Sequence, residues 1–224
     1  MIVEAISGAL PMAVGIAISP IPVTAIMMIL TSTRASTNAP AFLSGWFVGI
    51  MLVGFVVFLL PGIETARGEP TALSGLIRLI IGIAFLFLCG RSWRQRTVPD
   101  EPVKVPKVLA RLDQMRVSQS LVTGFLFSSV NLKNLFLSAV GAATVDASML
   151  GPAEQFIALL VFSSIASLTI AVPVAGYFMA RHSAEAIFAA CKNWLIRNNA
   201  NMIIVLLLVF GALLIGQGVK ILVV

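Results

Sequence analysis

Six long apolar runs are the feature that most constrains this chain. They cover residues 6–30, 39–60, 71–90, 119–145, 155–180 and 200–219. A helix needs roughly 20 apolar residues to cross about 30 Å of hydrocarbon. The intervals between the runs leave no room for a soluble domain. The sequence therefore predicts an all-α polytopic membrane protein with six transmembrane helices.

The composition agrees with this fold class. Hydrophobic residues make up 59% of the 224 residues, charged residues only 11%, and the mean hydropathy is +1.03. A soluble domain has about 45–50% apolar and about 25% charged residues. The chain opens with "MIVEAI" and has no Lys or Arg before Arg34. Because a signal peptide begins with basic residues, we expect the first run to be retained.

Basic residues predict the orientation. Eleven of the 15 Lys and Arg residues are Arg34 or lie in the connections 91–118 and 181–199, whereas the opposite side holds only Arg67 and Lys220. Cytoplasmic loops are enriched in Lys and Arg. We therefore predict a multi-pass protein of the cytoplasmic membrane with both termini outside. The net charge of +6 reflects this topology, and no nucleic-acid partner is expected.

The two basic connections also have an amphipathic pattern. Residues 105–115, within "VPKVLARLDQM", and residues 184–198 place apolar side chains at helical spacing among basic ones. Such segments lie on the anionic inner leaflet. A role as topology anchors is favoured over a regulatory role.

Weak internal repetition suggests two related halves. When the sequence is shifted by 110 residues, Ser19 falls on Ser129 and Thr24 falls on Asn134. Three spans in each half would place the halves in opposite orientations, which is a 3+3 inverted repeat. The predicted organisation is a first repeat (1–94), a cytoplasmic amphipathic linker (95–118) and a second repeat (119–224).

Two prolines interrupt the first apolar run, in "ISPIPVTAIMMIL" at 18–30. Proline lacks an N–H and clashes with the carbonyl one turn back, so Pro20 and Pro22 predict a break near the bilayer midplane. The freed carbonyls need protein or water partners, because lipid offers none. The corresponding stretch of the second half, "SSVNLKNLF" at 128–136, has no proline but is polar, and a break there is a weaker prediction. Two broken helices that meet at mid-membrane are typical of secondary transporter sites.

Lys133 lies within the fourth run and is the strongest functional signal. A charge near the bilayer centre costs about 2.5–3.5 kcal/mol on insertion scales and is functional by default. The spans contain no carboxylate to pair with it, so an anionic substrate is the predicted partner. The alternative is a structural lysine bound to carbonyls that the prolines free. Arg78 is a candidate second cation, although snorkelling toward the headgroups is the simpler explanation.

Catalysis and metal binding are not expected. His182 is the only histidine, no span carries paired carboxylates, and Cys89 and Cys191 form no CxxC motif. These residues supply neither a catalytic triad nor a metal site, and we expect no cofactor.

Small residues predict close helix packing. "GWFVG" at 45–49 is a Gly-x-x-x-Gly motif, and Ala212 with Gly216 forms a second small pair. Such pairs allow helices to approach closely. Packing within the chain is favoured, and a homodimer interface is the alternative.

Together, the six spans, the stretch "SPIPVTA", the stretch "NLKN" at 131–134 and the basic middle loop resemble the lysine exporter superfamily. The closest resemblance is to its glycopeptidolipid-addressing (GAP) family of actinobacterial envelope lipid transporters. The family motif has proline at the second position of "NPKN", where this chain has Leu132. The resemblance implies export across the cytoplasmic membrane, an inverted repeat, and movement of lipid-linked envelope components.

Three functions remain open at this point. The first is a transporter of an anionic lipid or glycolipid, the second is an exporter of amino acids or small solutes, and the third is a membrane scaffold without transport. The candidate substrate-binding residues are Ser19, Pro20, Pro22, Thr24, Ser129, Asn131, Lys133, Asn134 and Arg78.

Overall fold

Eight helices make up the part of the chain that the computed structural model describes, which is residues 1–59, 72–94, 115–148, 150–179 and 185–223. The helices are α1 (Ile2–Ala17), α2 (Pro20–Leu30), α3 (Ala35–Leu59), α4 (Ala72–Arg94), α5 (Val117–Ser129), α6 (Leu132–Asp146), α7 (Pro152–Met179) and α8 (Glu185–Val223). These described ranges contain no β-strand. The all-α prediction is therefore confirmed.

Four continuous segments are long and apolar enough to cross a membrane: α3, α4, α7 and the Ala200–Val223 part of α8. The pairs α1–α2 and α5–α6 also qualify when each is taken as one span, with bends of 56° and 65°. The chain is thus a multi-pass membrane protein. The predicted six spans correspond to these four segments and two bent pairs.

Both helix breaks are present. Pro20 and Pro22 lie in the first turn of α2, where a missing N–H leaves no bond unmade, and their rings prevent α1 from continuing. The fourth predicted span is broken between α5 and α6, although it has Leu132 where the family motif has proline. There the Asn131 side chain caps α6 by accepting a hydrogen bond from the Lys133 backbone N–H at 3.2 Å. Asparagine capping therefore replaces proline in starting α6.

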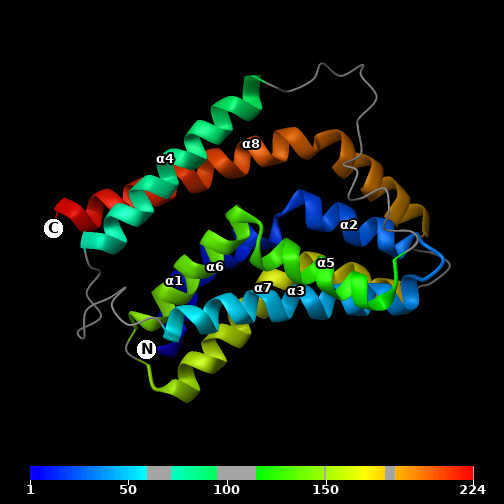
Figure 1. Ribbon diagram of the computed structural model, residues 1–224, viewed down its shortest axis with the longest axis horizontal. Coiled ribbons are helices and arrows are strands. Elements are labelled where there is room, and N and C mark those ends of the chain that lie inside the picture. Colours follow the sequence, from blue (N-terminus) through cyan, green and yellow to red (C-terminus); the bar gives the residue numbers. More distant parts are fainter. Residues whose placement is uncertain (60–71, 95–114, 149, 180–184, 224) are drawn as a thin grey trace.

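Figure 1 shows how the helices are arranged. α4 and α8 lie side by side at one edge, and α1, α3, α5, α6 and α7 form the body of the molecule. α2 contacts both α7 and α8 and so joins the two groups. The N and C termini lie at the same end of the molecule, as an even number of crossings requires.

Glycines allow the closest helix contacts. A Cβ added at Gly45 of α3 would lie 1.9 Å from the Leu121 carbonyl oxygen of α5, and one at Gly124 would lie 2.1 Å from the Phe42 carbonyl oxygen. "GWFVG" therefore packs within the chain, as favoured. Ala212 and Gly216 are exposed, so the favoured packing within the chain was wrong for this pair, and α8 uses Gly211 and Gly218 against α4 instead. The homodimer alternative for Ala212 and Gly216 stays a prediction.

The two halves run in opposite directions in Figure 1, each as one bent pair followed by two long helices. The ends of α1 and α5, and the starts of α2 and α6, are 112 residues apart rather than 110, so Ser19 corresponds to Asn131. α3 packs on α5 as α7 packs on α1, whereas α2 packs on α8 more extensively than α6 packs on α4. This partial agreement does not establish a symmetric repeat. The inverted repeat and the division at 94 and 118 remain predictions.

α8 is longer than the expected sixth span, because it continues without interruption from Glu185 to Val223. No Gly or Pro occurs between 185 and 210 to end it. Phe188 and Leu195, on the apolar face predicted for 184–198, are buried. Most of the amphipathic linker, 95–114, lies outside the described residues.

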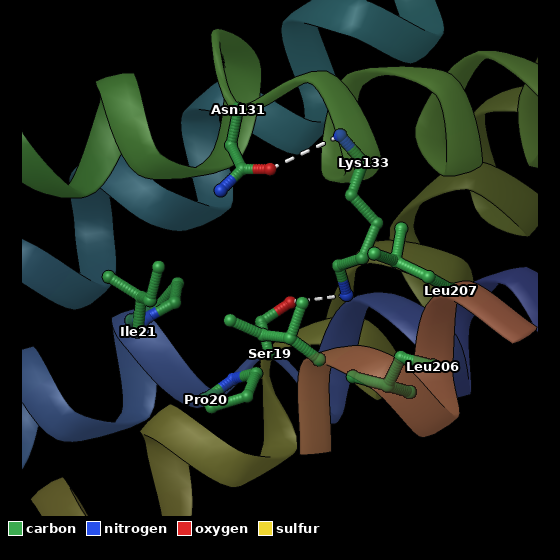
Figure 2. Close-up of a pocket in the computed structure, with 9 residues that line it drawn as sticks. Ser19, Pro20, Ile21, Asn131, Lys133, Leu206 and Leu207 are labelled. Atoms are coloured by element: carbon green, nitrogen blue, oxygen red, sulfur yellow. Dashed lines mark hydrogen bonds between the residues drawn. The ribbon is translucent and has the colours of Figure 1, made fainter. Parts of the chain in front are cut away.

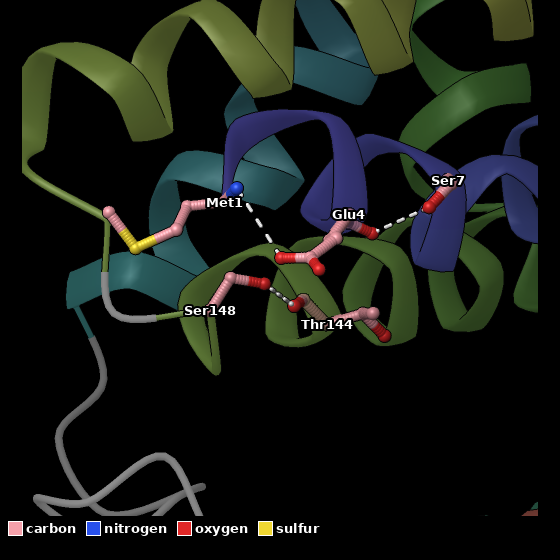
Figure 3. A network of polar contacts seen from close by, with 5 residues as sticks. All are labelled: Met1, Glu4, Ser7, Thr144 and Ser148. Atoms are coloured by element: carbon pink, nitrogen blue, oxygen red, sulfur yellow. Dashed lines mark hydrogen bonds and ion pairs between the residues drawn. The ribbon is translucent and has the colours of Figure 1, made fainter.

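The end that carries the termini is held by local contacts (Figure 3). The N-terminal ammonium lies 3.3 Å from Glu4, in an exposed pair, and the Ser7 hydroxyl donates to the Glu4 carbonyl at 2.9 Å. Gly8 of α1 lies against Thr144 of α6. These contacts lie at the start of α1, at the opposite end of that helix from its break after Ala17.

Candidate functional site

The two helix breaks face each other, and the end of α1 is the first part of the site. A helix that ends leaves its last carbonyls without intrahelical partners. Within α1, the Val14 carbonyl accepts from the Ile18 N–H at 3.0 Å. The Gly15 carbonyl accepts from the Lys133 ammonium at 2.6 Å, and the Ala17 carbonyl accepts from the Thr169 hydroxyl of α7. Side chains from α6 and α7 thus satisfy the broken end.

Lys133 is placed by the start of α6 and directed at the end of α1. It is the second residue of α6, where the helix dipole disfavours a cation. Its long side chain carries the ammonium away from that end to the carbonyl end of α1, where the dipole favours a positive charge. The same group donates to the Ser19 hydroxyl at 2.7 Å (Figure 2). Lys133 therefore bridges the two breaks.

A chain of hydrogen bonds extends from this lysine into the protein. The Ser19 hydroxyl, which accepts from Lys133, donates to the Asn134 side-chain oxygen at 2.9 Å. The Asn134 amide donates to the Phe127 carbonyl at 2.9 Å, near the end of α5. Ser19 and Asn134 are both buried. Each group orients the next, so the network holds α1, α2, α5 and α6 in one arrangement.

A cavity of about 200 Å³ lies beside this network (Figure 2). Its lining residues are Ser19, Pro20, Ile21, Pro22, Asn131, Lys133, Ile203, Leu206 and Leu207. The polar members come from the two breaks, whereas α8 supplies an aliphatic wall. The N-terminal ends of α2 and α6 also meet here, and their helix dipoles favour an anion, although Pro20 and Pro22 leave Ile21 as the one N–H donor among the first three residues of α2. The cavity thus joins a cationic, hydrogen-bonding edge to an apolar wall.

The structure brings together five of the nine predicted residues around this cavity: Ser19, Pro20, Pro22, Asn131 and Lys133. Asn134 lies behind them, in the hydrogen-bond network. Thr24 and Ser129 make local bonds to the carbonyls of Pro20 and Phe125, at 2.8 and 2.7 Å.

Arg78 is not at this cavity. It lies on α4 and donates to the Gln217 side-chain oxygen of α8 at 3.4 Å. The predicted second cation therefore belongs to the contact between α4 and α8.

Sequence reasoning missed the aliphatic wall and two helix-end partners. Ile203, Leu206 and Leu207 line the cavity, while Gly15 and Thr169 take part in bonds at the end of α1. Nothing in a uniformly apolar run distinguishes a leucine that faces a cavity from one that faces lipid. The excess of freed carbonyls at the break was the one available signal for a hydroxyl such as Thr169.

The described residues of the site include no cluster of metal-binding side chains. Among the described residues, no group of three His, Cys, Asp or Glu side chains lies close enough to hold a metal ion. None of the residues that line the cavity is acidic. The polar side chains that line the cavity are the Lys133 ammonium, the Ser19 hydroxyl and the Asn131 amide.

Comparison with known proteins identifies the family. The sequence profile described as "Sap, sulfolipid-1-addressing protein" matches residues 9–220, nearly the whole chain. No curated protein and no solved structure matches. The match supports the lipid-addressing part of the predicted resemblance, whereas membership of the lysine exporter superfamily stays a prediction. The chain belongs to the SfLAP family of Sap, sulfolipid-1-addressing proteins.

Proposed function

We propose that this protein carries an anionic lipid or glycolipid of the cell envelope across the cytoplasmic membrane, and that its cavity binds the charged headgroup. The family description names a sulfolipid, so a sulfated glycolipid is the first candidate substrate. The observation that carries the proposal is the position of Lys133 at the polar edge of the cavity, opposite Ile203, Leu206 and Leu207. An amphiphile has this same division of charge and apolar surface.

Charge favours an anion at this position. The Lys133 ammonium has three donors, two of which bind Gly15 and Ser19. Bonds between an ammonium and an anionic oxygen are about twice as strong as neutral ones. A free amino acid would also need an acceptor for its own ammonium, and the described lining residues include no carboxylate. The amino-acid exporter remains the alternative, with less support.

Size limits how much of the substrate enters. Pockets for drug-sized ligands measure about 300–1,000 Å³, and this cavity measures about 200 Å³. It has room for a sulfate or phosphate group with part of a sugar. The acyl chains of the substrate would remain in the bilayer beside the apolar wall.

Lipid binding in nanodiscs tests the proposal. We would compare a sulfated glycolipid with its unsulfated counterpart, for the parent protein, Lys133→Met and Lys133→Arg. We expect the parent to prefer the sulfated lipid, Lys133→Met to lose about tenfold in affinity or more, and Lys133→Arg to retain part of it. Arg34→Gln, which removes an exposed charge, is the control.

Two results would contradict this function. Normal binding by a folded Lys133→Met would reject the headgroup site. If Lys133→Met failed to fold, equal binding of the sulfated and unsulfated lipids by the parent and by Lys133→Arg would reject the headgroup site and leave Lys133 as a structural bridge, as a scaffold requires.

A further inference from the structure

α4 carries an exposed apolar stripe that leads to two arginines. The stripe is Leu73, Leu76, Ile80, Ile83 and Phe87, whose spacing of three and four residues places them on one face of the helix. These five side chains are between 45% and 72% exposed. Arg91 and Arg94 continue the same spacing at the end of α4. We call the five residues the α4 stripe.

A groove of about 410 Å³ lies where the stripe meets the arginines. It is lined by Leu86, Phe87, Gly90, Arg91 and Arg94. A Cβ added at Gly90 would meet no described atom within 4 Å, so the described residues leave the floor of the groove open. The groove shares no lining residue with the cavity at Lys133. It is a separate site.

The charges in the groove are positive. Arg91 and Arg94 are both exposed, and neither has an acidic partner among the described residues. A guanidinium presents a planar fork of donors that matches the oxygens of a phosphate. Trp93, which is 54% exposed, lies between them in sequence, and tryptophan is enriched at the level of lipid headgroups.

We propose that this groove binds the phosphate of an anionic phospholipid from the surrounding leaflet, with an acyl chain along the α4 stripe. Eleven residues separate Leu76 from Phe87, which is about 16 Å along a helix at about 1.5 Å per residue. The hydrocarbon of one leaflet is half of about 30 Å thick. The part of the stripe from Leu76 to Phe87 therefore matches the reach of one acyl chain below a headgroup at Arg91 and Arg94, and Leu73 lies one turn beyond it. This lipid is distinct from the transported substrate.

A second copy of the chain fits the groove less well. A two-fold dimer axis along the membrane normal would place Arg91 and Arg94 opposite the same residues of the other copy. Four guanidiniums would then face one another without acids from the described part of α4. The phosphate of an anionic lipid pairs with Arg91 and Arg94, whereas a dimer would bring four like charges together.

The test uses the full chain in phosphatidylcholine nanodiscs containing phosphatidylglycerol, with retained lipids counted by native mass spectrometry. Arg91→Gln/Arg94→Gln is compared with Arg34→Gln/Arg197→Gln, which removes two exposed charges elsewhere. A basic residue near an anionic membrane surface contributes about 1 kcal/mol, so the first variant should bind phosphatidylglycerol about 30-fold more weakly. The control should bind like the parent. Arg91→Lys/Arg94→Lys should fall between them.

Several results would overturn the proposal. Equal retention of phosphatidylglycerol by the parent and Arg91→Gln/Arg94→Gln would reject the site. If Arg34→Gln/Arg197→Gln lost as much phosphatidylglycerol as Arg91→Gln/Arg94→Gln, the loss would reflect net charge and not a specific groove. Displacement of the lipid by millimolar inorganic phosphate would assign the groove to a free anion. If the glutamine variant failed to fold, parent-like affinity in the lysine variant would reject the guanidinium fork. Lys133→Met should leave this binding intact, which separates it from the substrate site.

Discussion

The Lys133 ammonium lies 2.6 Å from the carbonyl oxygen of Gly15, which joins the start of α6 to the end of α1 across 118 residues of sequence. A lysine in an apolar run and a carbonyl freed by a helix break each carry a cost in a membrane. The hydrogen bond between Lys133 and Gly15 gives the charge and the freed carbonyl a partner in one contact. The same contact places the charge at the edge of a cavity, where a headgroup can reach it.

The first prediction concerns Asn134, which binds both Ser19 and the Phe127 carbonyl and is fully buried. Asn134→Leu keeps the size of the side chain but removes the acceptor of the Ser19 hydroxyl and the donor to the Phe127 carbonyl. We expect a loss of about 1–3 kcal/mol in the free energy of unfolding, measured by thermal or denaturant melts in detergent.

Ser129→Ala is the matched control, because the Ser129 hydroxyl bonds only the Phe125 carbonyl of its own helix. Its effect should be within about 0.5 kcal/mol. Equal melting of both variants would show that the network does not hold the two breaks together.

The second prediction concerns the contact between α3 and α5. The Cβ of Gly45→Ala would lie 1.9 Å from the Leu121 carbonyl oxygen, which is backbone and has little freedom to move. The helices would have to separate, and we expect a loss of about 1–3 kcal/mol, read as a lower melting temperature. Gly216→Ala has nothing within 4 Å of its added Cβ and should melt at or slightly above the parent temperature. The reverse order of stability would reject this helix contact.

The third prediction concerns Pro20 and Pro22. With alanine at both positions, no ring clash prevents α1 from continuing into α2, although Lys133 and Thr169 still hold the end of α1. We expect the double variant to melt within a few degrees of the parent but to move the sulfated glycolipid more slowly in proteoliposomes. Unchanged transport by a well-folded double variant would mean that the prolines serve only the architecture.

The fourth prediction concerns orientation. Both termini lie at one end of the molecule, and the Lys and Arg distribution predicts that this end is outside. In a background without Cys89 and Cys191, cysteines at the exposed positions Val3 and Val223 should react with an impermeant maleimide on intact cells. A cysteine at residue 107 should react only after permeabilisation. Labelling of residue 107 on intact cells would invert the topology.

Much of this protein is determined by the sequence alone. Apolar runs of membrane length require spans, and Pro20 and Pro22 require α1 to end, because neither effect depends on distant residues. The need of Lys133 for a partner follows in the same way, since a charge is costly anywhere in hydrocarbon.

The tertiary structure decided which groups meet. The break before α6 begins at the cap Asn131 rather than at a proline, and the two breaks lie 112 residues apart rather than 110. The partners of Lys133 at Gly15 and Ser19, the wall of Leu206 and Leu207, and the place of Arg78 beside Gln217 come from helix packing. Apolar residues look alike in a membrane sequence, because lipid and protein interior are equally apolar solvents. Only the packed helices distinguish a side chain that faces a cavity from one that faces the bilayer.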